Sequence, residues 1–437
     1  LTVQTPTSNG TRTAQKNPHE ASKEESYVTS GTFYLVEANG KIAKSITIDE
    51  QAWADAKIPQ QGNDGKTTLQ IPVEDVTAGT KYSVYFLANA TSASPLTDVY
   101  TSDLDNKFAK AYSADNKFAM FNQNDADVKA NSHTVVFTSD NKDSNSAAKV
   151  SDIIKIDRLT ARIDEPTSEA TEIKAYAEDA KATEAEKKAN EDAIKAVKGV
   201  TLTRYAISNV ANKTNVMQQW TDATTLSIPT GITYFQPTSE FGTKTLLQNY
   251  GYFNAVTTDK SNKDYVFENN SDDATSMYFE YTVELNKDYK TNADFEDGTF
   301  YRYNKVIYSR IQDIIDAYKD QKAIFDGKDA ATVKAELKAA KDDTTDRETK
   351  LDEFRKKYDI EVFNAGKTYY VQKIQDQHLG VANTIQRNSI YLLNVKNIFN
   401  VGAQVPNGGP DDRTLYYLEV EVSVNPWVLN SYDVDLE

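Results

Sequence analysis

The amino-acid sequence predicts a mainly β protein made of two tandem β-sandwich domains with helical insertions. Short segments in which apolar and polar residues alternate recur along the chain, as in half-buried strands. Turns rich in asparagine, aspartate and glycine separate these segments, and the chain contains 26 tyrosines, a residue enriched in strands. Its length of 437 residues exceeds that of one typical domain, so more than one domain is expected.

The composition narrows the range of functions. The chain has no cysteine and three histidines, which excludes disulfides and thiolate nucleophiles and disfavours zinc sites. A formal net charge of −16 disfavours binding to nucleic acid or to anionic membrane surfaces. No run approaches the ~20 apolar residues of a membrane-spanning helix. No nucleophile–base pair can be identified, so we expect a protein that is not an enzyme and requires no cofactor.

Residues 1–26 contain no apolar periodicity and are predicted to form a flexible N-terminal arm. The arm is rich in threonine, serine, asparagine and lysine, and it starts at Leu1 instead of methionine. We therefore expect a mature chain from which an export signal has been removed.

An N-terminal β-sandwich domain is predicted at residues 27–225. The segments 31–37 and 44–49 both alternate, and they flank the turn Asn39-Gly40, a strong hairpin signal. Short strands separated by turns are typical of a sandwich or barrel. The remaining strands of this domain are predicted at 67–73, 81–90, 132–139, 153–164 and 200–210.

A helical insertion is predicted at residues 168–198 of this domain. The segment is rich in alanine, glutamate and lysine, its apolar residues have helical spacing, and Gly199 follows as a C-cap. A strand resumes directly afterwards, so we expect the helix to decorate the sandwich without interrupting its core.

A C-terminal β-sandwich domain is predicted at residues 226–437, after a turn-rich boundary at 220–237. It contains a helical insertion at 306–358, in which three apolar stripes have helical spacing. Its strands are predicted at 264–269, 276–285, 300–304, 367–374, 388–398 and in the C-terminal pair.

The chain ends in two amphipathic strands. Apolar residues alternate with polar ones from Leu418 to Val424, and Asn425-Pro426 then breaks the pattern, because proline cannot donate to a sheet ladder. A second extended segment, 426–437, alternates again. Chain termini are usually frayed unless docked, so this last strand is expected to pair with its own sheet or with that of another molecule.

The second half resembles the C-terminal domain of type V pilins, the fimbrillins of Gram-negative anaerobic bacteria. A Gly-x-x-Tyr-Tyr strand at 366–370 precedes an Arg-Asn-x-x-Tyr strand at 387–391, and Trp427 opens the last strand. Their order and spacing are more specific than any single motif. Further matches to the family lie at 156–163, 200–210 and 264–269. The chain is most similar to the longer branch, the shaft subunit of the short fimbriae.

This resemblance implies an assembly mechanism. Fimbrillins have transthyretin-like sandwiches and are exported as lipoproteins. An arginine-specific protease then removes an N-terminal segment, and a strand from the next subunit fills the groove left behind. The resemblance places that donor strand at 426–437 and implies a groove in the N-terminal domain. The donor residues are predicted to be Trp427, Val428, Leu429, Tyr432, Val434 and Leu436.

The expected function is therefore a structural fimbrial subunit that polymerises by donor-strand exchange into an adhesive fimbria on the outer membrane. Its expected partners are copies of itself, accessory anchor and tip subunits, and receptors on host or bacterial surfaces. The alternative is a monomeric cell-surface adhesin or glycan-binding lipoprotein that uses loops of the same sandwiches. Trp427 has two open interpretations as well, a donor-strand anchor or a core residue of its own domain.

Other polar residues are interpreted as structural. Arg387 is expected to form an ion pair, and Asn388 to cap a turn before a strand. No metal-ligand spacing accompanies the histidines, and the acidic loops at 140–143 and 268–273 do not have the spacing of a calcium loop. We therefore expect the three histidines to be structural or exposed and the two loops to be solvated turns.

Overall fold

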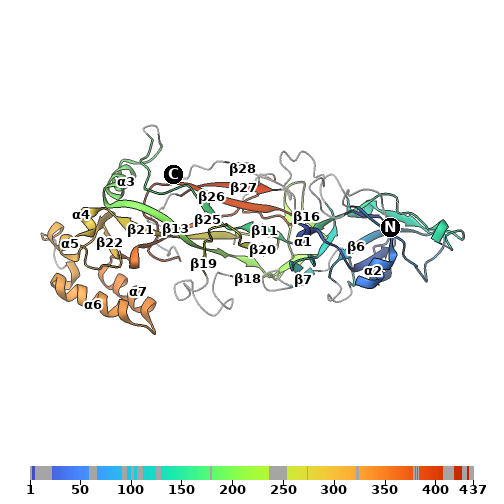
Figure 1. Cartoon of the computed structure of the whole chain (residues 1–437), viewed down its shortest axis with the longest axis horizontal. Coiled ribbons are helices and arrows are strands. Elements are labelled where there is room, and N and C mark those ends of the chain that lie inside the picture. Colours follow the sequence, from blue (N-terminus) through green and yellow to red (C-terminus); the bar gives the residue numbers. More distant parts are fainter. Residues whose placement is uncertain are drawn as a thin grey trace.

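The computed structural model shows an elongated, mainly β molecule, which confirms the predicted class (Figure 1). The first half of the chain lies at one end of the molecule, and the helices of the second half lie at the other end. The structure describes residues 2–4, 22–58, 66–90, 96–99, 103–105, 112–124, 129–142, 144–177, 180–235, 253–272, 274–320, 324–376, 379, 381, 383–406, 418–425 and 431–432.

The first half is built on one large sheet with the strand order β3-β2-β6-β8-β10-β1-β5-β4, and β9 pairs with β6. The terminal strand β1 lies in the middle of this order, parallel to β10 and antiparallel to β5. The strands are β1 (Thr2–Gln4), β2 (Gly31–Val36), β3 (Ile42–Ile48), β4 (Lys57–Ile58), β5 (Lys66–Leu69), β6 (Lys81–Ala88), β8 (Met120–Asn122), β9 (Thr134–Val136) and β10 (Ile154–Arg158).

Strands β2 and β6 of this sheet have buried residues on both faces. Phe33 of β2 packs into one cluster, where its ring stacks on Phe86 with centroids 4.2 Å apart. The next residue, Tyr34, points to the other face and packs into a second cluster. Helix α2 (Glu50–Ala56) is capped by Asp49 and adds Trp53 to the first cluster. The alternation along β2 therefore separates two cores instead of a core and solvent.

The second half contains two sheets that face each other across one core. The first has the order β20-β11-β26-β27-β28 with β12 beside β26, and the second has the order β19-β13-β21-β25. Leu393 of the first sheet and Phe279 of the second belong to the same buried cluster. The strands are β11 (Ala161–Asp164), β12 (Thr167–Ser168), β13 (Val197–Ser208), β19 (Asn254–Ala255), β20 (Lys263–Val266), β21 (Ser276–Leu285), β25 (Lys367–Lys373), β26 (Ile390–Ile398), β27 (Leu418–Asn425) and β28 (Ser431–Tyr432).

The described parts of the two halves also contain short strand pairs and 3-10 turns. One pair, β7 with β15, links a segment of the first half to a segment that follows β13. The remaining elements are β7 (Asp103–Asp105), β14 (Val210–Ala211), β15 (Lys213–Asn215), β16 (Gln219–Trp220), β17 (Leu226–Ser227), β18 (Tyr234–Phe235), η2 (Ala130–Ser132), η3 (Ser144–Ser146) and η7 (Asn364–Gly366).

The sheets divide the chain near residue 160, not at the predicted boundary of 225. Strand β11 pairs with β20 and β26, and β13 pairs along its length with β21. The predicted domain 27–225 includes both strands. The assignment was wrong because alternation predicts that a segment is a strand but does not identify its partner.

The predicted flexible arm at 1–26 includes an ordered helical turn. Helix α1 (Lys23–Ser26) begins with a capping box in which Ser22 and Glu25 bond to each other's backbone N–H groups. Glu25 is 1% exposed. The arm prediction therefore fails for residues 22–26, because a four-residue helix is too short to produce an apolar period.

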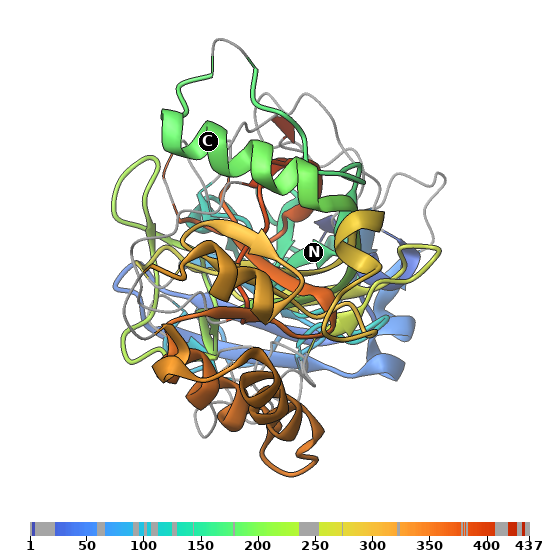
Figure 2. The same ribbon diagram turned by 90° about the vertical axis from the view of Figure 1, so that its left-hand side faces the viewer.

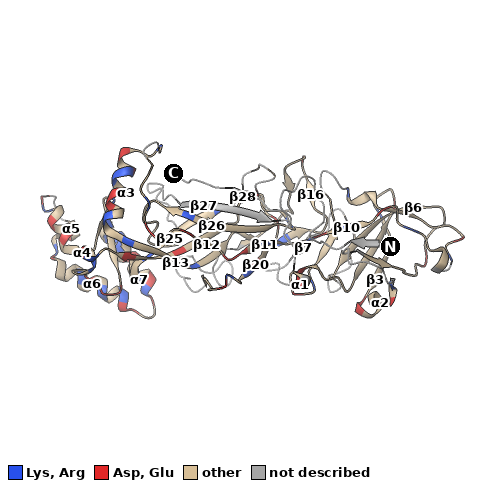
Figure 3. Ribbon diagram, turned by 45° about the horizontal axis from the view of Figure 1, so that its top comes forward, with Lys and Arg blue, Asp and Glu red and all other residues tan. Residues whose placement is uncertain are grey.

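The first helical insertion is shorter than predicted. Helix α3 (Glu184–Ala196) starts at a Thr183 capping box and continues directly into β13, so Gly199 lies within the strand and is not a C-cap. Its alanine-rich face packs on the core between the two sheets. Acidic and basic residues both recur along the helix (Figure 3).

The second insertion forms a compact unit with its own core. Its helices pack on a three-stranded sheet with the order β23-β22-β24. Figure 2 shows α3 and the pair α6 and α7 on opposite sides of the strands between them. The elements are α4 (Lys287–Lys290), β22 (Phe300–Tyr303), β23 (Val306–Tyr308), α5 (Ile311–Ala317), η6 (Ile324–Gly327), α6 (Ala330–Asp342), α7 (Arg347–Tyr358) and β24 (Glu361–Phe363).

Candidate assembly site

The C-terminal strands form an antiparallel extension of the β26 edge. Strand β27 runs along β26, and its register places Val420, Val422 and Val424 opposite residues of β26 that are buried in the core. Strand β28 then pairs with β27 through Val422↔Tyr432 and Ser423↔Ser431. Among the described residues, β28 is therefore the edge strand of this sheet.

Of the predicted donor residues, the structure describes the backbone of Tyr432 alone. It lies in β28 and pairs with β27 of the same chain. The other five lie outside the described residues, so their role stays a prediction: Trp427, Val428, Leu429, Val434 and Leu436.

The N-terminal strand β1 occupies a slot between two strands of the first sheet. Val3 pairs with Ile154 of β10 on one side and with Thr67 of β5 on the other. Ile154 and Leu69, on the two walls of the slot, are fully buried in the same cluster. The three residues of β1 thus bridge two strands that do not pair with each other.

Arg387 forms the buried ion pair predicted from the sequence. Its Nε donates to Glu268 Oε2 at 2.9 Å, and its Nη1 donates to the carbonyl of Val216 at 2.8 Å. Asn388 has a positive φ of 55°, as a turn residue before a strand can have. Both residues also contact segments outside their own sheet, which the sequence did not indicate.

A second buried ionic cluster lies where the two halves meet. Arg162 donates to Glu25 Oε1 at 2.8 Å and to Asp164 Oδ2 at 2.7 Å, and Arg158 donates to the carbonyl of Glu25 at 2.7 Å. Arg158 is 1% exposed. This cluster could not be predicted from the sequence, since Glu25 is 137 residues from Arg162 and no spacing rule connects them.

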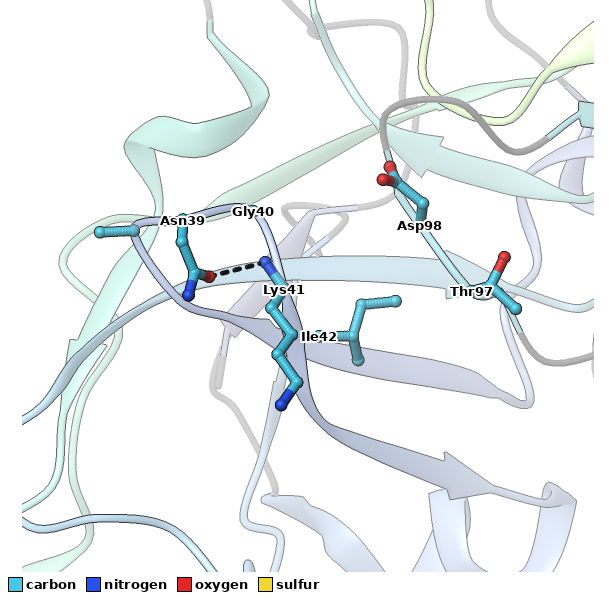
Figure 4. Close-up of a pocket in the computed structure, with 7 residues that line it drawn as sticks. Asn39, Gly40, Lys41, Ile42, Thr97 and Asp98 are labelled. Carbon is cyan, nitrogen blue, oxygen red and sulfur yellow. Dashed lines mark hydrogen bonds between the residues drawn. The ribbon is translucent and has the colours of Figure 1, made fainter.

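The surface offers a shallow polar hollow beside the hairpin of β2 and β3 (Figure 4). It is lined by the turn Asn39–Ile42, with Thr97 and Asp98 from a neighbouring segment. Asn39 accepts a hydrogen bond from the N–H of Lys41, which holds the turn. The lining contains no histidine or paired carboxylates that would suggest catalysis.

Among the described residues, no group of three or more metal-ligating side chains is close enough to hold an ion. In that same part of the chain, no helix combines the length and the apolar character needed to cross a bilayer. His133 is 2% exposed, whereas His19 and His378 lie outside the described residues.

The C-terminal part of the chain matches a protein family. Residues 361–433, from β24 to β28, match the model described as major fimbrial subunit protein type IV, fimbrillin, C-terminal. No protein with a curated description matches the chain.

Three solved structures illustrate what the whole chain is similar to. One is a protein of Parabacteroides distasonis proposed to act in cell adhesion, with 13% identity, coverage of 97% of this chain and 95% of that chain, and a TM-score of 0.49. A fimbrilin of Porphyromonas gingivalis has 12% identity, coverage of 95% and 96%, and a TM-score of 0.45. The fimbrial anchor protein Mfa2 of the same organism has 8% identity, coverage of 99% and 98%, and a TM-score of 0.28. The family match at residues 361–433 confirms the resemblance to fimbrillins that was predicted from the sequence.

Proposed function

We propose that this protein is a structural subunit of a cell-surface fimbria and that it polymerises by exchanging a terminal strand between neighbouring copies. The observation that carries the proposal is the position of β1. A terminal segment fills the middle of a sheet, between β10 and β5, with three residues. Such a strand can be replaced by a longer one without rearranging the rest of the sheet.

The slot has the properties of an acceptor. Without β1, the facing edges of β10 and β5 expose unpaired N–H and C=O groups, which natural proteins avoid. The buried Ile154 and Leu69 would also become accessible between them. An extended strand from another molecule satisfies the backbone groups and covers the apolar residues, as in β-augmentation.

The donor in this proposal is the segment 426–437. Its nine residues from Val428 to Leu436 span about 30 Å when extended, far more than the length of β1. Tyr432, Val434 and Leu436 alternate with acidic residues, which would face away from the slot. The proposed donor residues are Trp427, Val428, Leu429, Tyr432, Val434 and Leu436.

The segment can leave its own sheet at little cost. In the described part of the chain, the segment pairs with β27 through two residues of β28. Release of β28 leaves the longer pairing of β26 with β27 in place. A donor from one copy and an acceptor in the next make a head-to-tail contact, and such contacts propagate into filaments.

The wider setting follows from the fimbrillin likeness. We propose export as a lipoprotein, removal of an N-terminal segment by a protease, and assembly with anchor and tip subunits on the outer membrane. Two transthyretin-like domains, one for each half, and adhesion to receptors on host or bacterial surfaces belong to the same proposal. No enzymatic step and no cofactor is part of it.

Electron microscopy with size-exclusion chromatography tests the proposal. Three samples are compared: the full chain, the chain without residues 1–4, and that shortened chain ending at Asn425. The chain with an open slot and an intact C-terminal segment is expected to form filaments. The sample that ends at Asn425 is expected to stay monomeric and folded. Filaments from both shortened chains would refute a role for 426–437.

A matched pair of substitutions separates the two sides of the donor strand. In the chain without residues 1–4, Leu436→Ser is expected to slow polymerisation at least tenfold, whereas Asp435→Ser leaves it nearly unchanged. If neither shortened nor full chains polymerise under any condition, the monomeric adhesin becomes the better account.

A further inference from the structure

Helix α1 lies at the junction between the two halves of the molecule, near β7 and β20 (Figure 1). Its Glu25 is buried, and the N–H of Ser22 donates to Glu25 Oε2 at 3.0 Å. The helix is only one turn long, so it is held in place by what it contacts and not by its own stability.

Glu25 bonds to both halves at once. Arg158, the last residue of β10 in the first half, donates from Nε to the Glu25 carbonyl at 2.7 Å and from Nη2 to Ser26 Oγ at 3.1 Å. From the second half, Arg162 of β11 donates to the Glu25 carboxylate at 2.8 Å, and the hydroxyl of Tyr265 in β20 donates to it at 2.8 Å. One residue thus joins strands of two separate sheets.

The covalent link between these sheets is short. Only Leu159 and Thr160 separate β10 from β11, and both are fully buried. A two-residue connection between rigid sheets is a natural hinge unless other contacts restrain it.

A second segment restrains the same connection. Asn388 donates from Nδ2 to Asp157 Oδ1 at 3.0 Å, accepts from Arg158 Nη1 at 2.7 Å, and donates its backbone N–H to the carbonyl of Thr160 at 2.8 Å. Arg158 therefore touches α1 and the loop before β26 together. The hinge is clamped by two segments that are far apart in the sequence.

The charges in this cluster are balanced. Burial raises the pKa of Glu25, but the guanidinium of Arg162 and the hydrogen bonds from Ser22 and Tyr265 outweigh this effect, so the net pKa lies below its ordinary value. Glu25 is therefore a carboxylate at neutral pH. Its removal would leave a buried guanidinium with fewer partners, which is a costly change.

We infer that α1 is an interdomain lock: Glu25 and its two arginine partners act together with Asn388 and the β7–β15 pair to hold the halves in one orientation, and loss of the Glu25 contact loosens the connection at residues 159–160. The inference does not depend on strand exchange, because the lock acts within a single chain. It also sets a limit on processing. Removal of residues up to 21 leaves the lock in place, whereas removal past Ser26 opens it.

The inference can be tested with two spin labels. Because the chain has no cysteine, the labels attach only to two introduced cysteines. Thr47→Cys in β3 and Thr258→Cys near β19 are exposed and belong to different halves. Pulsed electron paramagnetic resonance on the full-length monomer then reports the distribution of distances between the labels. Three further substitutions are compared in this background: Glu25→Ala, Glu24→Ala and Tyr265→Phe.

Glu25→Ala is expected to widen the distance distribution at least twofold, and Tyr265→Phe to widen it less. Glu24→Ala, the same change at the exposed neighbour, leaves it as narrow as in the unsubstituted protein. Circular dichroism shows whether each variant is folded. A folded Glu25→Ala chain with an unchanged width overturns the inference. If Glu25→Ala does not fold, the distance distribution of Tyr265→Phe is the test. An unchanged width for that variant also overturns the inference.

Discussion

The two terminal segments of the chain enter their sheets at different places. Strand β1 lies in the middle of the first sheet and pairs on both sides, whereas β28 lies at the edge of its sheet and pairs only with β27 among the described residues. Loss of β1 leaves unpaired edges on two strands that face each other, whereas loss of β28 leaves one unpaired edge on β27. In the proposed assembly, the slot now filled by β1 would be the acceptor, and the segment that contains β28 would be the donor.

The largest effect in this comparison is expected at β26, the strand that holds the C-terminal hairpin. Leu393, 1% exposed, lies opposite Val422 of β27, and Leu393→Ala should lower the free energy of unfolding by about 2–5 kcal/mol. Denaturant titration measures the loss. Leu392→Ala, the same change at the half-buried neighbour, serves as the control. Equal losses at both positions would show that β26 does not anchor the hairpin through the core.

Deletion of the terminal strands themselves should give a smaller and unequal effect. Removing residues 1–4 costs about 0.5–1.5 kcal/mol for each ladder hydrogen bond on both sides of β1. Removing 431–437 breaks the ladder on one side only. Hydrogen exchange should therefore speed up in both β5 and β10 after the first deletion, and in β27 alone after the second. Equal changes in hydrogen exchange after the two deletions would contradict the expected difference between a strand inside a sheet and a strand at its edge.

Acid should destabilise the half that contains β1. Burial lowers the pKa of His133 below its ordinary value, with Asp152 opposing and Lys155 adding to the shift. Neither ring nitrogen has a hydrogen-bond partner. The folded state therefore keeps the imidazole neutral, whereas the unfolded chain binds a proton below about pH 6.5.

The direction of the pH dependence of stability follows from this difference in proton binding. Stability attributable to His133 is complete above about pH 6.5 and falls as the pH decreases, by up to ~1.4 kcal/mol for each pH unit. Denaturant titrations at pH 7.5 and 5.5 measure the decrease, and His133→Phe should remove most of it. An unchanged pH dependence in that variant would mean that other groups cause the acid sensitivity.

The smallest effect is expected from an exposed ion pair of the second half. Lys198 and Glu284 lie 2.9 Å apart, but both side chains are about half exposed, so Glu284→Gln should not change the unfolding midpoint measurably. Glu361→Gln is the matched counterpart, because Glu361 pairs with Arg302, which is 3% exposed. A larger loss at Glu284 than at Glu361 would contradict this ranking.

The sequence predicted the strands well because alternation is a local property. The predicted segments 31–37, 81–90 and 276–285 correspond to β2, β6 and β21. Pairing is not local, so 200–210 was recognised as a strand but assigned to the wrong half.

The buried ionic cluster where the two halves meet could not be predicted from the sequence for a similar reason. An arginine that forms a buried ion pair has the same local pattern as one that faces water, and only the fold brings Glu25 to Arg162. For the proposed assembly site, the sequence indicated the terminal strand segment through its alternation. It did not indicate the slot, because the position of β1 depends on how β10 and β5 approach each other.

The lock at the junction also has a consequence for the order of folding. Tyr265 is 240 residues from Glu25, and Asn388 is 230 residues from Arg158. Contacts between such distant residues form late, because long loops must close before the contacts compensate the lost entropy. Local hairpins can form as soon as they are synthesised, but the junction closes only after residue 388 has emerged. A chain interrupted before that point cannot complete it, so closure of the junction distinguishes complete subunits from fragments.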